Sequence, residues 1–179
     1  MLNKLKEFLE KIKDSNQFKE WNTSHKNSYF CSAFLIGADI DQHNWQIDFY
    51  NPENDKITSF IEVGGLITLK EEDVFKKPDD KVKELDLEKV KIDLEKALDK
   101  FERLKKKKYH SESPTQKIII LQNMDFIIWN ITYINTSFNI LNIKINAVNG
   151  KVIDDSLTSV MSFKDKKFDT AALSKFKKN

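Results

Sequence analysis

The chain has 179 residues, of which 40% are hydrophobic, and its 30 lysine and arginine residues against 28 acidic residues leave a net charge of +2. This near-neutral balance disfavours a dedicated nucleic-acid surface, which normally carries a strong basic excess. No run approaches the ~18 apolar residues of a membrane span, and the charged N-terminus lacks the apolar region of a signal peptide. We therefore expect a cytoplasmic protein whose partners include neither nucleic acid nor membrane.

Two short helices are predicted at the N-terminus. An apolar stripe at helical spacing ends before Asp14-Ser15-Asn16, whose side chains favour helix caps and turns. Phe18 and Trp21 lie off that stripe, so they belong to a second helix that packs from another direction. We expect helices at about 2–14 and 16–24, the first of which carries the stripe Leu2, Leu5, Phe8, Leu9 and Ile12.

Strands are predicted in the rest of the first half. Tyr29–Ile36 is a nearly continuous apolar run, which is typical of a central strand. Residues 45–50 and 57–63 alternate between apolar and polar, and Gly64-Gly65 ends the second of these runs. A fourth strand is possible at Leu66–Leu69. The charged stretch that follows contains Pro78 and is predicted to connect the two halves.

A long helix is predicted at the start of the second half. Asp86 belongs to a residue type that caps helices, and the apolar spacing after it predicts a helix over about 87–109. Lys105–Lys108 close this helix, where cations suit the macrodipole, so the basic run requires no nucleic acid. The predicted buried stripe consists of Leu87, Val90, Leu94, Ala97, Leu98, Phe101 and Leu104.

The stretch 118–153 is predicted to be a β-meander. Its alternating runs are followed by Asn149-Gly150, and such a pair typifies a hairpin turn that needs positive φ at both positions. A last strand is expected at Ser156–Met161. The strands of the meander are expected at Ile118–Leu121, Phe126–Ile134 and Phe138–Ala147.

The two halves resemble each other after a shift of 84 positions. Trp45 then coincides with Trp129, and Asn51 coincides with Asn135 at a turn. Since side chains alternate between the two faces of a strand, the shared parity predicts that both halves bury the same face. The same shift aligns Ile47 with Ile131, Phe49 with Tyr133, Ile57 with Leu141, Ile61 with Ile145 and Val63 with Ala147.

The end of this meander resembles a PepSY domain. That family shows a strand and then a second strand that ends in a D-A-x-x-G-K-V turn. The tandem order of helices and meander is similar to the β-lactamase-inhibitor-like architecture, to which PepSY domains are related. The resemblance implies a stand-alone protein with a curved sheet, helices on one side, and a role in binding or inhibition. It rests on Trp129–Tyr133 and Leu141–Ile153, where Ala147, Gly150, Lys151 and Val152 match and Asn146 replaces the Asp.

The predicted fold class is α+β, with two tandem α-β-β-β(-β) units that form an antiparallel curved sheet with helices packed on one face. The first repeat is expected over 1–70, and a connector over 71–85. The second, PepSY-like repeat is expected over 86–163. Residues 164–179 are predicted to be a C-terminal tail or a short helix.

The sequence shows no catalytic, cofactor or metal motif. His25, His43 and His110 lie far apart, without the paired spacing of metal ligands. Cys31 is the only cysteine and lies in an apolar strand, so we expect a buried thiol and no disulfide within the chain. We therefore predict a non-enzymatic protein without cofactors. A small enzyme with a pocket formed by the curved sheet remains the alternative.

A partner site is predicted on the sheet face that lies opposite the tryptophans. Parity places polar residues such as Asp48 and Asn130 on this face, together with an apolar group near the turn after Asn135. Ile134 and Phe138 are expected to face each other as a cross-strand pair. The predicted partner-binding residues are Tyr50, Phe60, Ile134, Phe138 and Ile140.

The sequence leaves three alternatives for the occupant of this predicted site. It could bind an external protein or peptide, it could bind a second copy of the chain to form a homodimer, or the C-terminal segment could cover it. The third possibility rests on the apolar residues Phe168, Leu173 and Phe176.

Overall fold

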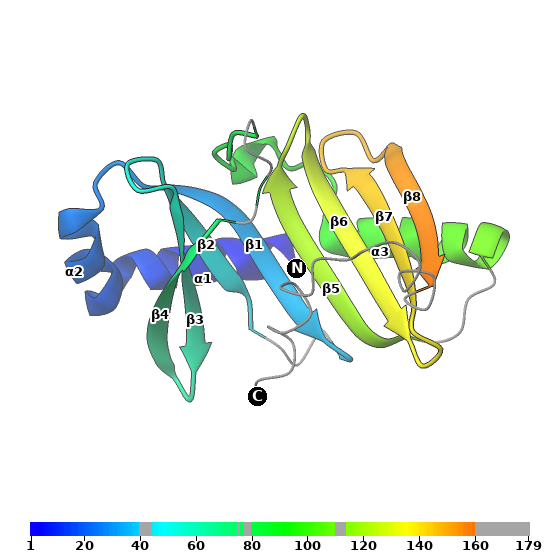
Figure 1. The fold of residues 1–179 in the computed structure, drawn as a ribbon, viewed down its shortest axis with the longest axis horizontal. Coiled ribbons are helices and arrows are strands. Elements are labelled where there is room, and N and C mark those ends of the chain that lie inside the picture. Colours follow the sequence, from blue (N-terminus) through cyan, green and yellow to red (C-terminus); the bar gives the residue numbers. More distant parts are fainter. Residues whose placement is uncertain (40–43, 75, 77–79, 110–113, 160–179) are drawn as a thin grey trace.

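The first half of the chain forms two helices and four strands in a computed structural model, which describes residues 1–39, 44–74, 76, 80–109 and 114–159 (Figure 1). The predicted C-terminal helix and the side chains of His43, Phe75 and His110 lie outside these residues. The elements are α1 (Leu2–Asp14), α2 (Asn16–Ser24), β1 (Tyr29–Gly37), β2 (Gln46–Asn51), β3 (Lys56–Val63) and β4 (Leu66–Asp73).

The second half repeats this order of helix and then strands. It begins with a short 3-10 helix, and a π-helical turn extends its α-helix. The elements are η2 (Leu87–Lys89), α3 (Leu94–Leu104), η3 (Lys105–Tyr109), β5 (Pro114–Asn123), β6 (Ile127–Asn135), β7 (Asn139–Asn146) and β8 (Val152–Ser159).

All eight strands form one antiparallel sheet in the order β4-β3-β2-β1-β5-β6-β7-β8. This order is symmetric about the central pair, in which Leu35 of β1 lies opposite Ile119 of β5. These two residues are 84 positions apart, so the shift found in the sequence relates the two central strands by a local twofold axis. The predicted α+β fold with two similar halves is confirmed.

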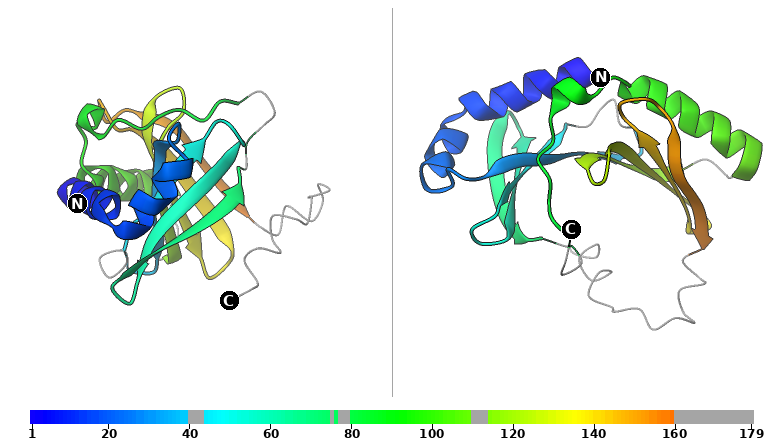
Figure 2. Two further views of the ribbon diagram at one scale, coloured as in Figure 1. Left: turned by 90° about the vertical axis from the view of Figure 1, so that its left-hand side faces the viewer. Right: turned by 90° about the horizontal axis from the view of Figure 1, so that it is seen from above.

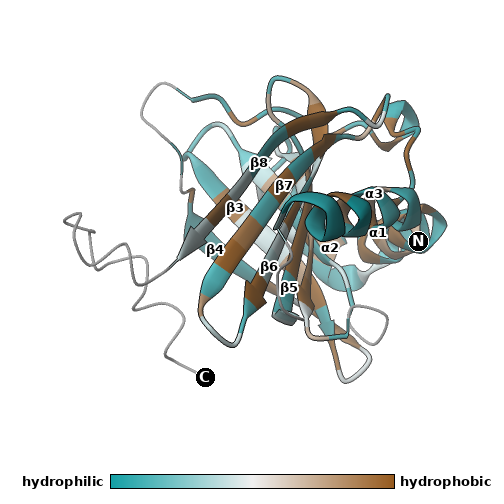
Figure 3. Ribbon diagram, turned by 90° about the vertical axis from the view of Figure 1, so that its right-hand side faces the viewer, coloured by the Kyte–Doolittle hydropathy of each residue, from teal (hydrophilic) through white to brown (hydrophobic). Residues whose placement is uncertain are grey.

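The helices of the described residues lie on one face of this sheet. α1 and α3 lie end to end along that face, which we call the covered face, and the opposite face is the open face (Figure 2). Trp45, Ile47 and Phe49 are buried under the helices, as are Trp129, Ile131 and Tyr133, and this confirms their predicted placement. The alternation of hydrophilic and hydrophobic residues along the strands is visible in Figure 3.

Ser15 separates the first two helices as predicted. Its backbone is extended, and its hydroxyl accepts a hydrogen bond from the Phe18 backbone nitrogen at 3.2 Å, which caps α2. The change of direction lets Phe18 and Trp21 pack against Phe49 and Phe60 from the end of the sheet. The helix bounds expected from the stripe and the cap are confirmed.

The predicted helix over 87–109 is wrong in its first turns. Asp86 caps only the short η2, and α3 starts at Leu94 with Asp93 as its N-cap. Between them, the backbone nitrogens of Lys91 and Ile92 both donate to the Ala147 carbonyl oxygen at 2.9 Å. The chain therefore pairs with the β7–β8 turn instead of continuing the helix, since this tertiary contact satisfies its backbone groups.

The β7–β8 hairpin is confirmed, but its turn is wider than the predicted two residues. Only Gly150 has positive φ, at 75°, and its nitrogen donates to the Asn146 carbonyl oxygen at 2.8 Å. The Asn146 side chain accepts hydrogen bonds from the backbone nitrogens of Val148 and Asn149. This side-chain acceptor organises the turn, so that only one glycine-like position is needed.

The register of β3 corrects the gapless match between the halves. Ile47 lies opposite Phe60, whereas Ile131 lies opposite Ile143, so the third strands are related by 83 positions rather than 84. The cause is turn length, because Pro52–Asp55 supply four residues after β2 and Thr136–Phe138 supply three after β6. One extra residue turns every side chain of β3 to the other face.

The segment that connects the halves passes from the open face to the covered face. Lys76 reaches Asp55 beside the open face, and the Tyr29 hydroxyl donates to the Val82 carbonyl oxygen at 2.8 Å. The Leu85 nitrogen then donates to the Phe30 carbonyl oxygen at 2.8 Å, and Leu85 is buried in the core. The connector therefore covers part of the open face of the first half.

Candidate functional site: the open face of the sheet

An apolar strip lies at the centre of the open face, where the two halves meet. Phe34 and Ile36 of β1 lie opposite Ile120 and Ile118 of β5, and the strip consists of these four residues. Ile36 is 41% exposed and the other three are half-buried. The sequence did not indicate this strip, because the pairing of strands from different halves leaves no local signal.

A second apolar group lies on the β6–β7 hairpin. Ile134 pairs with Ile140 on the open face, and both are half-buried. Phe138 follows in the turn and is 63% exposed. We call Ile134, Phe138 and Ile140 the turn patch. The predicted Ile134–Phe138 cross-strand pair is wrong, because the turn ends at Phe138 and the next strand begins at Asn139.

Phe138 has a left-handed backbone, with φ of 55°. Its nitrogen donates to the Asn135 carbonyl oxygen at 3.0 Å, and the Asn139 nitrogen donates to the Asn135 side chain at 2.8 Å. Such a three-residue loop needs positive φ at its last position, where glycine is usual. A bulky residue there is a conformational outlier.

The first half carries Asp55 at the corresponding place. Asp55 has φ of 56° and is the last residue of the β2–β3 turn, 83 positions before Phe138. Aspartate tolerates this conformation better than phenylalanine does. Asp55 also has a local structural role, since it accepts a hydrogen bond from the Tyr50 hydroxyl at 2.5 Å. Within the described residues, no hydrogen bond or ring contact of the Phe138 side chain provides a comparable reason.

Two of the predicted partner-binding residues are not exposed. Phe60 lies on the covered face and is fully buried against Phe18, Trp21 and Phe49, so its assignment to the open face was wrong. The extra turn residue before β3 is the reason. Tyr50 does lie on the open face, yet it is only 7% exposed.

The burial of Tyr50 has identifiable causes. Its ring packs edge-on against Tyr29 at 5.5 Å, and the Lys76 ammonium group lies 5.9 Å from its centroid. The connector thus occupies the surface that strand parity alone would leave free.

In the second half of the chain, the rest of the open face is polar. The Asn142 side chain donates to the Asn130 and Thr132 side-chain oxygens at 2.7 Å each, and Lys144 pairs with Asp154 at 2.8 Å. This polar surface lies between the turn patch and the end of the sheet at the β7–β8 turn, as predicted from parity. The Asn130 and Asn142 amides and the Thr132 hydroxyl form hydrogen bonds with one another, and none of these groups is charged.

A buried carboxylate lies on the open face of the first half. Asp48 is 3% exposed and accepts hydrogen bonds from Ser32 Oγ at 2.8 Å, Gln46 Nε2 at 2.8 Å and Ser59 Oγ at 2.7 Å. Burial raises the pKa of this carboxyl, and the three hydrogen bonds lower it only in part. Sequence parity indicated the face of Asp48, but not its burial.

A pocket of about 630 Å³ lies between this carboxylate and the connector. Its size falls within the ~300–1,000 Å³ that small-ligand pockets usually have. The sheet supplies its floor and the connector and the β5–β6 turn supply its walls. Its lining includes Cys31, Ser32, Phe34, Asp48, Ile57, Val74, Lys76 and Met124.

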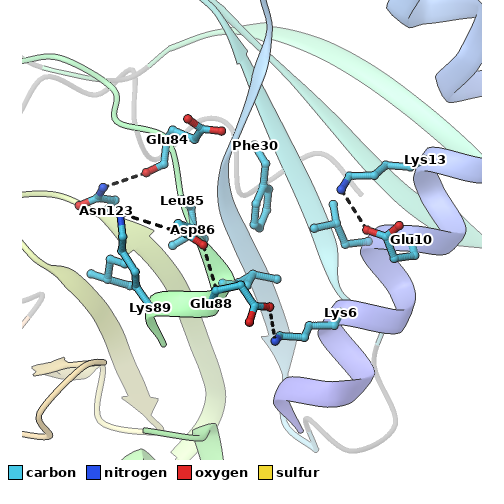
Figure 4. A pocket seen from close by; sticks show the side chains of 13 residues that line it. Lys6, Glu10, Lys13, Phe30, Glu84, Leu85, Asp86, Glu88, Lys89 and Asn123 are labelled. Atoms are coloured by element: carbon cyan, nitrogen blue, oxygen red, sulfur yellow. Dashed lines mark hydrogen bonds and ion pairs between the residues drawn. The ribbon is translucent and has the colours of Figure 1, made fainter. Parts of the chain in front are cut away.

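A second pocket, of about 740 Å³, lies on the helix side between α1 and the connector (Figure 4). Its charged groups are engaged with one another: Lys6 pairs with Glu88 at 2.6 Å and Lys13 pairs with Glu10 at 2.9 Å. The Asn123 amide donates to the Glu84 carbonyl oxygen at 2.8 Å. These contacts tie α1, the connector and β5 together, so we assign this pocket a structural role.

The described residues contain no group of three or more His, Cys, Asp or Glu side chains that could hold a metal ion. Cys31 is 4% exposed, and burial raises the pKa of its thiol to about 12. A reactive cysteine needs the opposite, a lowered pKa and access to solvent. In the same part of the chain, none of the helices has the length and apolar character needed to cross a membrane.

No protein-family model matches the chain, and no curated protein matches its sequence. One solved structure that is similar to this chain is the crystal structure of a putative lipoprotein from Clostridium difficile 630. The two are 12% identical, with a TM-score of 0.38 over 80% of this chain and 91% of that chain. A likeness at this level carries no argument about function, so the PepSY resemblance stays a prediction.

Proposed function

We propose that this protein is a non-enzymatic binding protein, of the kind that the PepSY resemblance implies, which binds a protein or peptide through its open face. The observation that carries this proposal is Phe138, a bulky side chain that is 63% exposed at a backbone position with φ of 55°. Backbone outliers of this kind typically cost ~1–3 kcal/mol and cluster at functional sites.

The neighbours of Phe138 support a binding role. Its ring is exposed beside the half-buried pair Ile134–Ile140, and the polar surface around Asn142 follows on the same face. Aromatic anchors surrounded by polar groups are typical of interface hot spots. The uncharged amide surface suits the backbone of a protein or peptide better than it suits a phosphate, which requires basic groups.

Selection of displayed peptides tests this proposal. A random peptide library is selected on the wild-type protein, with counter-selection on the Phe138→Gly variant, because glycine suits the turn and removes only the ring. We expect enriched peptides whose affinity falls by at least about tenfold, or ~1.4 kcal/mol, in Phe138→Gly. The matched control is Phe126→Gly, since Phe126 is also exposed, at 55%, but lies in the β5–β6 turn.

The outcomes separate the candidate occupants. Peptides that bind wild type and Phe138→Gly equally would contradict the assignment to the turn patch, and so would a library without enrichment. Sedimentation velocity of the same proteins detects a second copy as the occupant. A wild-type dimer that dissociates in Phe138→Gly but persists in Phe126→Gly would replace the external partner with self-association.

We also propose that the protein catalyses no reaction of its own. Catalysis by acyl or phosphoryl transfer would need an activated nucleophile with a positioned base, and the buried thiol of Cys31 does not have that character. A panel of hydrolase and oxidoreductase substrates checks this. An activity that survives repurification and disappears with one point mutation at the open face would overturn it. Cell fractionation tests the cytoplasmic location, which we propose on the sequence alone.

A further inference from the structure

The Asp48 carboxylate has a hydrogen-bond set that contains no cation. Its three donors are the hydroxyls of Ser32 and Ser59 and the amide of Gln46. None of the ion pairs among the described residues includes Asp48. A carboxylate has about four acceptor positions, so the three donors leave one unused.

Two of the lysines that line the pocket already have acidic partners. Lys76 pairs with Asp55 at 3.0 Å and Lys83 pairs with Asp125 at 3.5 Å. A further charge that raises the pKa of Asp48 is that of Glu72, which is also negative and pairs with Lys70 at 2.7 Å. The buried acid therefore lacks a counter-charge within the described part of the chain, and a buried charge is costly unless it is paired.

The pocket in front of Asp48 has apolar walls. Phe34 and Ile57 line it from the sheet, Val74 lines it from the connector and Met124 lines it from the β5–β6 turn. Charged and polar groups of the connector, including Lys81 and Asp80, lie at the same pocket. A pocket with apolar walls and a buried acid on its floor is complementary to an aliphatic chain that ends in a positive charge.

We propose that this pocket takes an aliphatic ammonium or guanidinium group, whose stem lies along Phe34, Ile57 and Val74 and whose charged head pairs with Asp48. The ligand is either a free alkylamine or the lysine or arginine side chain of a peptide. The site does not depend on the turn patch, since none of the three turn-patch residues lines this pocket. Failure of one proposal therefore leaves the other standing.

A purely structural role for the Asp48 network does not explain why its central side chain carries a charge. The network joins β1, β2 and β3 through Ser32, Asp48 and Ser59, so it does help to fix their register. An asparagine would serve the same purpose, because its oxygen accepts from Ser59 and Gln46 and its amide donates to the Ser32 hydroxyl. Only the charge of Asp48 is left without a structural reason.

Titration by nuclear magnetic resonance tests the site on the full chain. The probe is n-pentylamine, n-pentanol is its neutral counterpart, and N-acetyl-lysine-methylamide represents a peptide side chain. We expect pentylamine to shift resonances of pocket residues, and Asp48→Asn to weaken it by at least about tenfold. The matched control, Asp80→Asn at the rim of the same pocket, should change the affinity by less than about twofold.

The two ligand sources give different results. If the blocked lysine binds as well as pentylamine, the ligand is a peptide side chain, and if only pentylamine binds, the ligand is a free amine. The proposal is overturned if pentanol binds equally, if Asp48→Asn binds pentylamine like wild type, or if none of the amines binds below about 50 mM.

A second variant tests the pocket if the Asp48→Asn protein fails to fold. Val74→Trp leaves the carboxylate and its three donors in place and fills the pocket from the connector side. We expect it to abolish pentylamine binding while the resonances of sheet residues that do not line the pocket stay unshifted. Unchanged binding in Val74→Trp would overturn the proposal.

Discussion

The indole rings of Trp45 and Trp129 lie against each other on the covered face, with 6.4 Å between their centroids. The two residues are 84 positions apart and stand at the same place in their respective halves. Trp129 is fully buried, and its Nε1 donates to the Ile92 carbonyl oxygen at 2.8 Å. The contact joins the cores of the two halves into one.

Trp129→Ala should therefore destabilise the whole chain. Truncation of a fully buried tryptophan typically costs ~3–5 kcal/mol in the free energy of unfolding. Urea unfolding monitored by circular dichroism measures this, and an equilibrium loss below about 1 kcal/mol would contradict the assignment of Trp129 to the core. In a double-mutant cycle with Trp45→Ala, we expect a coupling of ~0.5–1.5 kcal/mol from the ring contact.

Phe138 should destabilise the isolated protein, because its backbone has φ of 55°. Phe138→Gly and Phe138→Asp are expected to raise the urea midpoint, by the equivalent of roughly 1 kcal/mol. Aspartate is the residue that the first half uses at this position. Phe138→Val is the control, since a β-branched residue keeps the strain and should not stabilise. A midpoint that falls in Phe138→Gly would show that the ring packs in the folded chain.

The elements with local signals could be predicted from the sequence. Ser15 provides the cap that divides the first two helices, and Gly64-Gly65 provides the positive φ values of the β3–β4 turn. The helix-covered face of β2 and β6 followed from alternation around Trp45 and Trp129. In these places, the residue types themselves determine the local backbone.

Long-range features could not be predicted. The pairing of β1 with β5 creates the central strip of Phe34 and its neighbours, and no residue of either strand specifies that partner. The connector helps to bury Tyr50 by passing over it, and Asp48 is buried among side chains of three strands. Of the five predicted partner-binding residues, Phe138 is exposed and Ile134 and Ile140 are half-buried on the open face, because their hairpin is formed by neighbouring residues.

The turn after β2 is predicted to control the orientation of β3. Deletion of Asn54 would leave three residues between Asn51 and Lys56, as in the second half, and would turn Phe60 away from the core. We expect a loss of about 3–5 kcal/mol or failure to fold, since Phe60 is fully buried. Asn54→Ala keeps the turn length, and its stability should stay within about 0.5 kcal/mol of wild type. Equal stabilities for the two variants would contradict this explanation of the register.

The Cys31 thiol should be inert in the folded protein. Burial raises the pKa of this thiol to about 12 from 9.0, and the thiolate is the reactive form. At pH 8, labelling with iodoacetamide is therefore expected to be slower by on the order of a hundredfold or more than in urea. Mass spectrometry measures both rates. Rapid labelling of the native chain would mean that the strand around Cys31 opens readily.

Asp48→Asn is predicted to stabilise the protein at neutral pH. Burial raises the pKa of the Asp48 carboxyl in the folded state, so the folded chain holds this proton to a higher pH than the unfolded chain does. Stability then falls as the pH rises from the ordinary aspartate pKa through the raised one, and the loss is complete above the raised pKa. Below the ordinary value, both states are protonated and Asp48 contributes no pH dependence.

The difference in stability between Asp48→Asn and wild type isolates this contribution. Other acids, such as Asp55 and Glu71, have lowered pKa values and act in the opposite direction, but they cancel in the difference. We expect a difference near zero at pH 3 that grows as the pH rises towards 7, with Asp48→Asn the more stable protein. Thermal unfolding across this pH range measures it. If Asp48→Asn is less stable than wild type at pH 7, the charge itself supports the fold, and the reason to seek a cationic ligand for Asp48 disappears.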